Sequence, residues 1–199
     1  TLGSINLTVV ITSPAKGVIR VQTCHHAGMS AKSPAFELNT SEDNMSGTET
    51  DELITIASGD LSLEITKLPW SMTYKHKGRV LSKSGRKDLA LMKTDWKGYA
   101  YDKGDYTDTY IRQQLSMGVG ELLYGFGERF TPFVKNGQSI DIFNQDGGTS
   151  TEQSYKNIPF YVSNKGYGVF VNHPEKVSFE VGTEMVTKAC LRAERSDHP

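Results

Sequence analysis

The side chains of this sequence most suited to chemistry lie in one short segment, residues 144–156. Asp146 follows the apolar run Ser139–Phe143 and precedes two glycines, which allow close approach of another backbone or a ligand. A carboxylate at such a position can accept two hydroxyl hydrogen bonds, and its charge strengthens both. The neighbouring hydroxyls of a sugar ring are suitable donors. From these residues alone, an Asx turn in which Asp146 caps its own loop is the favoured interpretation, and a hydroxyl-binding carboxylate is the alternative.

Two more polar side chains, Tyr155 and Lys156, follow on the same segment. Between them and Asp146, Thr149 and Glu152 have the spacing of a capping box, in which each side chain satisfies a free backbone amide near the other. We therefore expect one short helix after the two glycines, and we take Tyr155 and Lys156 as candidate substrate-binding residues beside Asp146. Packing of the loop against the rest of the domain is the simpler explanation of both.

The elements that would position this segment are β-strands. Alternating and β-branched runs recur along the chain between clusters of Gly, Pro, Asn and Asp, which is typical of an antiparallel β-sandwich. The predicted strands are Leu7–Ile11, Val18–Thr23, Leu53–Ile56, Leu61–Thr66, Trp70–Tyr74, Tyr110–Met117, Ser139–Phe143, Phe160–Val162, Tyr167–Val171 and Val177–Val181. We expect loops at Asn39–Asp51, which is too hydrophilic to pack, and at Ser82–Asp108. The predicted class is all-β.

Composition excludes several classes of partner. The 199 residues carry a net charge of −1 with no basic stripe, which argues against binding to nucleic acid or to an anionic membrane surface. No apolar run is long enough to cross a bilayer. The two cysteines, Cys24 and Cys190, lie far apart in the sequence, so a disulfide framework is not expected. This cysteine usage favours the cytoplasm, and secretion is left open.

The sequence predicts neither a metal site nor a cofactor. The five histidines show no helical four-residue spacing, and the adjacent pair His25-His26 points to opposite faces of a strand. There is no phosphate loop and no dinucleotide-binding fingerprint.

A longer motif surrounds the candidate residues. It comprises Tyr124-Gly125-Phe126-Gly127-Glu128-Arg129, then Asn144-Gln145-Asp146-Gly147-Gly148-Thr149-Ser150-Thr151-Glu152-Gln153-Ser154-Tyr155-Lys156-Asn157-Ile158-Pro159-Phe160-Tyr161, then Gly166-Tyr167-Gly168-Val169-Phe170-Val171-Asn172-His173-Pro174. In these parts the chain resembles the amino-terminal β-sandwich of glycoside hydrolase family 31, and specifically its α-xylosidase branch. The resemblance is strongest from residue 119 to residue 188. It implies a supersandwich similar to the galactose mutarotase fold.

The resemblance implies a non-catalytic domain of a retaining α-glycosidase that acts on an α-xyloside or α-glucoside. In that family both catalytic carboxylates are Asp residues of a (β/α)8 barrel that follows the sandwich, so this chain alone is not expected to be a complete enzyme. Asp146 matches the family's Asp that binds the sugar on the leaving-group side, and Glu128-Arg129 matches a structural pair. Gln145 stands where close relatives usually carry Arg, which puts in doubt any loop geometry that depends on a guanidinium.

The resemblance also sets the expected limits of the domain. We expect residues 1–188 to form the sandwich. Residues 189–199 are polar, lack alternation and are expected to be a divergent tail where relatives continue with a strand, with the catalytic barrel absent. The expected partners are a carbohydrate and that barrel, and a homo-oligomer is left open.

Two functions of other classes compete with this interpretation. One is a carbohydrate-binding module, with an aromatic platform that would consist of Trp96, Tyr99, Tyr101 and Tyr106. The other is a mutarotase-like epimerase, which needs a His/Glu acid–base pair. No histidine here stands in a recognisable catalytic setting.

Overall fold

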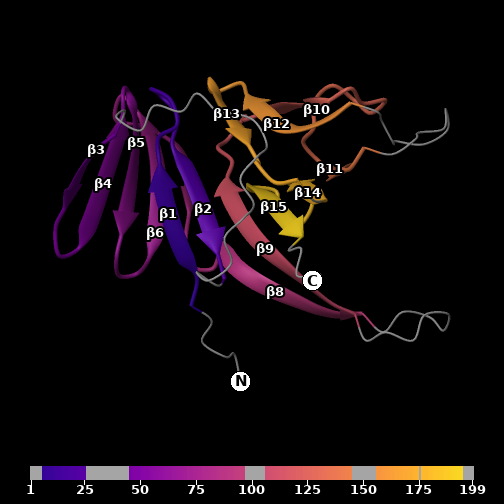
Figure 1. The fold of residues 1–199 in the computed structure, drawn as a ribbon. Helices are drawn as coiled ribbons and strands as arrows, with labels where there is room; N and C mark the ends of the chain where they lie inside the picture. The colour runs from indigo at the N-terminus through magenta and orange to yellow at the C-terminus, as the bar shows by residue number, and fades with distance from the viewer. Residues whose placement is uncertain (1–5, 26–44, 97–105, 145–155, 175, 195–199) are drawn as a thin grey trace. The chain divides into compact units, whose positions relative to one another are not determined.

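The computed structural model describes residues 6–25, 45–96, 106–144, 156–174 and 176–194 (Figure 1). Every strand pairing in these ranges is antiparallel, and no helix occurs within them. The predicted all-β class is therefore confirmed. The expected helix falls in residues 149–156, of which the structure describes only Lys156. The chain divides into two compact units, residues 1–86 and 87–199.

The first unit contains a two-stranded ribbon and a five-stranded meander. The ribbon pairs β1 (Thr8–Thr12) with β2 (Arg20–Cys24). The meander follows chain order: β3 (Ser46–Glu49), β4 (Leu53–Ser58), β5 (Leu61–Thr66), β6 (Ser71–His76) and β7 (Arg79–Ser84). Its core consists of Leu63, Ile65 and Met72, with apolar side chains of β1, β2 and β4 packed around them. Period-2 alternation in β5 places Leu63 and Ile65 on one face, and Met72 of β6 lies opposite Ile65.

The second unit contains two sheets. The larger has the strand order β11-β14-β15-β9-β8, and the smaller has the order β10-β12-β13. The strands of the larger sheet are β8 (Leu89–Trp96), β9 (Tyr106–Ser116), β11 (Gln138–Ile142), β14 (Val177–Val181) and β15 (Lys188–Glu194). Those of the smaller sheet are β10 (Leu123–Gly127), β12 (Asn157–Ser163) and β13 (Tyr167–Phe170).

Three buried aromatic rings join the two sheets of the second unit. Phe126 of β10 and Tyr161 of β12 both contact Phe179 of β14, with ring centroids 4.7 Å and 6.3 Å apart. All three side chains are almost completely buried. Tilted and edge-on ring contacts of this kind add to the hydrophobic stabilisation. The smaller sheet thus packs its inner face on the larger one, as in a sandwich.

All ten predicted strands are present, and five further strands were missed. The missed strands are β3, β7, β8, β10 and β15. β3 lies in the predicted loop Asn39–Asp51 and is fully exposed, so it is a polar edge strand rather than a loop. β8 and the first residues of β9 lie in the predicted loop Ser82–Asp108.

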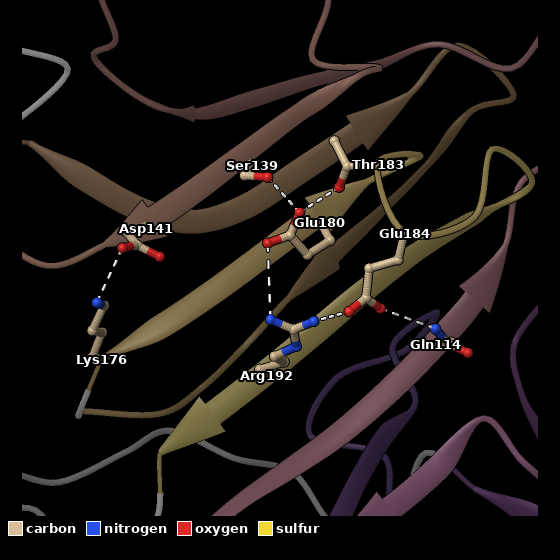
Figure 2. Close-up of polar contacts among 8 residues, drawn as sticks. All are labelled: Gln114, Ser139, Asp141, Lys176, Glu180, Thr183, Glu184 and Arg192. Carbon is tan, nitrogen blue, oxygen red and sulfur yellow. Dashed lines mark hydrogen bonds and ion pairs between the residues drawn. The ribbon is translucent and has the colours of Figure 1, made fainter. Parts of the chain in front are cut away.

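The prediction that the strand pattern ends at Lys188 was wrong, because β15 lies between β14 and β9 in the larger sheet. The absence of alternation has a structural reason, because the strand is buried on both faces: Ala189, Cys190 and Leu191 are all buried, and Arg192 is half-buried. The polar appearance came from Arg192, whose charge is balanced by Glu180 and Glu184 (Figure 2). The domain limits of 1–188 and 189–199 stay a prediction.

Both cysteines are free, and Cys190 is buried on β15. Burial raises the pKa of the Cys190 thiol, and the nearby Arg112 guanidinium opposes this in part. Because the thiolate is the reactive form, Cys190 should be inert in the folded chain.

We expect a thiol-reactive dye at pH 8 to label the half-buried Cys24 first and Cys190 only after denaturant is added. Rapid labelling of Cys190 in the native protein would contradict the buried position of β15.

The aromatic contact between the sheets yields a stability prediction. Phe126→Ala should lower the free energy of unfolding by about 3–5 kcal/mol, the usual cost of removing a fully buried ring. The control is Phe130→Ala, because Phe130 is 77% exposed and its removal should change stability by less than about 0.5 kcal/mol. Urea denaturation followed by circular dichroism measures both. Equal effects would show that the ring contact does not join the sheets.

Candidate functional site

The structure describes the two chain ends that carry the candidate segment. Asp146 and Tyr155 lie outside the described residues, so their roles stay predictions. Lys156 is described, and it immediately precedes β12. Asn144 follows β11 by two residues. We call the contacts that hold these two ends together the loop stem.

Two asparagines close the loop stem. The backbone N–H of Asn157 donates to Oδ1 of Asn144 at 3.0 Å. The side-chain amide of Asn157 donates to the same oxygen at 3.1 Å and to the Phe143 carbonyl at 2.9 Å. These three bonds hold the end of β11 beside the start of β12. The intervening residues 145–155 are therefore anchored at both ends.

The end of β10 passes very close to the same stem. Gly127 pairs with Asn157, and the N–H of Glu128 donates to the Lys156 carbonyl at 3.0 Å. A Cβ on Gly127 would lie 2.0 Å from the Lys156 oxygen, and the residue has φ = +83°. Only glycine meets both conditions, because a side chain would collide with backbone and would disfavour this φ. Gly127 thus explains one glycine of the Tyr-Gly-Phe-Gly motif.

The pairing of β10 with β12 is irregular between Gly125 and Gly127. Phe126, between them, has φ = +69°, which is uncommon for a residue with a side chain. The same residue has its ring fully buried between the sheets. A local irregularity of this kind redirects a side chain. Here we infer that it points the Phe126 ring into the core while the backbone continues to the loop stem.

Charged side chains surround the loop stem on its solvent side. Lys156 Nζ lies 3.7 Å from Glu128 Oε2, and both side chains are largely exposed. Such an exposed pair contributes little stability. The Lys156 side chain is 76% exposed.

Arg129 links β10 to β11. Its guanidinium donates to the Asp141 carbonyl at 2.5 Å and to the Phe126 carbonyl at 3.4 Å. The Asp141 carboxylate in turn lies 3.0 Å from Lys176 Nζ (Figure 2). These contacts agree with the structural role expected for Glu128-Arg129, because Glu128 pairs with Lys156 and Arg129 binds backbone carbonyls.

A buried carboxylate fixes the opposite end of the smaller sheet. Glu121 accepts hydrogen bonds from the Ser163 hydroxyl at 2.5 Å, the Tyr167 hydroxyl at 2.6 Å and the Gly118 N–H at 2.7 Å. A buried carboxylate needs such donors to offset its lost hydration. These contacts join β12 and β13 to the segment before β10. No local pattern indicates this role of Glu121, because only the fold brings the three donors together.

A second polar cluster lies on the larger sheet (Figure 2). Arg192 lies between Glu184, with which it forms a close ion pair, and Glu180, 3.9 Å away. Glu180 also accepts hydroxyl hydrogen bonds from Ser139 and Thr183. These contacts explain how β15 is held, although Arg192 Nε is buried and has no hydrogen-bond partner among the described residues.

The remaining candidates are a metal site, a membrane-spanning helix and the aromatic platform. Within the described ranges, no three His, Cys, Asp or Glu side chains gather as a metal site. The same ranges hold no helix that could span a bilayer. Trp96 and Tyr106 are paired in register at the ends of β8 and β9. Their side chains, and residues 99 and 101, lie outside the described part, so the aromatic platform stays a hypothesis.

Known proteins resemble this chain over most of its length. Residues 8–180 match the family model described as the glycosyl hydrolase 31 N-terminal galactose mutarotase-like domain. The chain is 40% identical over 188 residues to the α-xylosidase XylQ of Lactiplantibacillus pentosus, covering 94% of this chain and 23% of that protein. It is 43% identical over 206 residues to an α-xylosidase of Emericella nidulans, covering 98% and 26%. The chain therefore spans about a quarter of the length of these curated relatives.

A solved structure agrees in fold. The cycloalternan-forming enzyme from Listeria monocytogenes, in complex with a pentasaccharide substrate, superposes with a TM-score of 0.78. The match covers 98% of this chain and 18% of that one at 20% sequence identity. At this identity the likeness concerns the fold alone.

The close approach at the loop stem can be tested with two glycines. Gly127 and Gly137 have nearly the same φ, +83° and +80°, but nothing lies within 4 Å of a Cβ on Gly137. Gly137→Ala should cost about 1–2 kcal/mol of unfolding free energy, the cost of a left-handed conformation alone. Gly127→Ala should cost about 3 kcal/mol or more, because the backbone must also move. Chemical denaturation measures both, and equal costs would contradict the close approach to Lys156.

Proposed function

The chain belongs to the family of glycosyl hydrolase 31 N-terminal galactose mutarotase-like domains, and we propose that it serves as the non-catalytic β-sandwich of an α-xylosidase-type hydrolase. In this proposal residues 145–156 form a loop that lines a substrate subsite. The catalytic acid and nucleophile belong to the part of the relatives that this chain does not span. The substrate is an α-xyloside or an α-glucoside.

The observation that carries this proposal is the loop stem. Three asparagine hydrogen bonds and the Gly127–Lys156 contact fix both ends of a segment that contains Asp146. A binding group must be held in place before the ligand arrives, because ordering it on binding weakens affinity. The stem provides such support without itself containing an acid–base pair. This combination suits a wall of a subsite rather than a complete active site.

Each candidate residue then has a specific task. The Asp146 carboxylate accepts hydrogen bonds from two neighbouring hydroxyls of the sugar on the leaving-group side. Lys156, exposed at the stem, carries a donor beside the same loop. Tyr155 supplies a flat surface and one hydroxyl. No metal or cofactor takes part in the proposal.

Substitution of Asp146 tests the subsite directly. This chain would replace the matching quarter of the Emericella nidulans α-xylosidase, to which it is 43% identical. In the joined polypeptide, Asp146→Ala should lower kcat/KM for an α-xylosyl disaccharide by about 10- to 100-fold, the value of one or two hydrogen bonds to a charged group. Hydrolysis of α-xylosyl fluoride should hardly change, because its leaving group is not a sugar.

Asp51→Ala, at an exposed turn of the first unit, is the matched control and should affect neither substrate. Equal losses on both substrates would show that Asp146 acts on folding or on the catalytic step. No loss on either would remove Asp146 from the subsite. Only the selective loss supports the proposal.

A further inference from the structure

The smaller sheet of the second unit is apolar on both faces. Along β12, Tyr161 and Ser163 point to the buried side. The alternate residues Ile158, Phe160 and Val162 point to the other side and are exposed. A strand with one solvated face normally alternates apolar with polar residues, whereas a strand covered on both faces is apolar throughout. β12 has the pattern of the covered kind.

The exposed side chains form one surface across the three strands. The strand register places Phe170 of β13 opposite Phe160, and Tyr124 of β10 opposite Val162. Phe133 extends the surface, since its ring centroid lies 5.1 Å from that of Tyr124. We call this the apolar outer face; its members are Tyr124, Phe133, Ile158, Phe160, Val162 and Phe170. Phe160, Phe170 and Phe133 are 38%, 57% and 79% exposed.

Gly168 gives the apolar outer face its shape. A Cβ at this position would lie 2.6 Å from Cζ of Phe160, so the Phe160 ring lies directly over the glycine. Contact between an aromatic ring and a glycine on the neighbouring strand keeps the ring flat against the sheet.

We propose that the apolar outer face is the surface on which the catalytic part of the hydrolase packs, an inference that rests on the proposed function. The relatives extend over about four times the length that this chain spans, so a large additional body exists in them. Contiguous aromatic surface of this kind is rare on an isolated soluble domain and typical of the centre of a stable interface.

The position of the face supports this occupant. Ile158 follows Asn157 directly, so the apolar outer face begins at the loop stem. A body that covers the face therefore also lies beside the loop stem.

Hydroxyl-radical footprinting measures the burial of these rings. Oxidation of Phe133, Phe160 and Phe170 should be at least about fivefold slower in the joined polypeptide than in the 199-residue chain alone. Leu68, on the first unit and 90% exposed, is the internal reference for radical dose. Equal oxidation rates in the two proteins would overturn the proposal. Rings that are already protected in the chain alone would also overturn it. If that protection depends on protein concentration, a second copy covers the face; if it does not, the chain itself covers it.

A double variant provides an independent readout. Phe133→Ser with Phe170→Ser should change the melting temperature of the chain alone little, because both rings are more than half exposed there, and should lower that of the joined polypeptide. Val10→Ser, at an exposed position of β1, is the matched control and should lower neither. A joined polypeptide insensitive to the double variant would contradict the proposal.

The two proposals can fail separately. If the rings are oxidised equally fast in both proteins but Asp146→Ala selectively lowers disaccharide hydrolysis, the apolar outer face is rejected and the subsite is kept. If the rings are protected in the joined polypeptide but Asp146→Ala has no effect, the subsite is rejected and the apolar outer face is kept. If the joined polypeptide does not fold, footprinting of the intact Emericella nidulans α-xylosidase against its own matching quarter decides the question.

Discussion

The structure around the candidate site depends on the close approach between β10 and the start of β12. Gly127 leaves no room for a side chain against the Lys156 carbonyl, and the backbone there must adopt a positive φ. This contact lets Glu128 continue the pairing and brings Arg129 within reach of the Asp141 carbonyl. Three strand ends therefore meet at one point. The segment from 145 to 155 starts and finishes beside that point.

The same constraint links the site to the hydrophobic core. The irregular pairing at Gly125–Gly127 turns the Phe126 ring inward, where it contacts Tyr161 and Phe179. Burial of these rings fixes the inner face of the smaller sheet, while its outer face stays apolar and exposed. One strand, β12, thus takes part in the core, the loop stem and the apolar outer face. A domain that only bound sugar in isolation would have no evident need for the last of these.

Sequence patterns predicted the strands whose alternation is set by burial, such as β5 and β14, which have the predicted bounds. They missed strands whose residues look unlike strand formers. β3 is polar because it lies at a sheet edge, and two of the five residues of β10 are glycines because this strand must pass close to another backbone. The residues of β15 neither alternate nor look apolar, because the strand is buried on both faces and Arg192 is paired with Glu180 and Glu184 only in the fold. Local patterns do not contain such non-local partners.

The candidate site was predictable only in part, for a related reason. The motif pointed to the segment that contains Asp146, yet the roles of Asn144 and Asn157 depend on the adjacency of β11 and β12.

The direct test of the account is to find which residues lie next to the leaving-group sugar. A disaccharide α-xyloside with a diazirine on that sugar, irradiated in the joined polypeptide and mapped by mass spectrometry, should cross-link to residues 145–156. Cross-links confined to the part contributed by the relative would contradict the account.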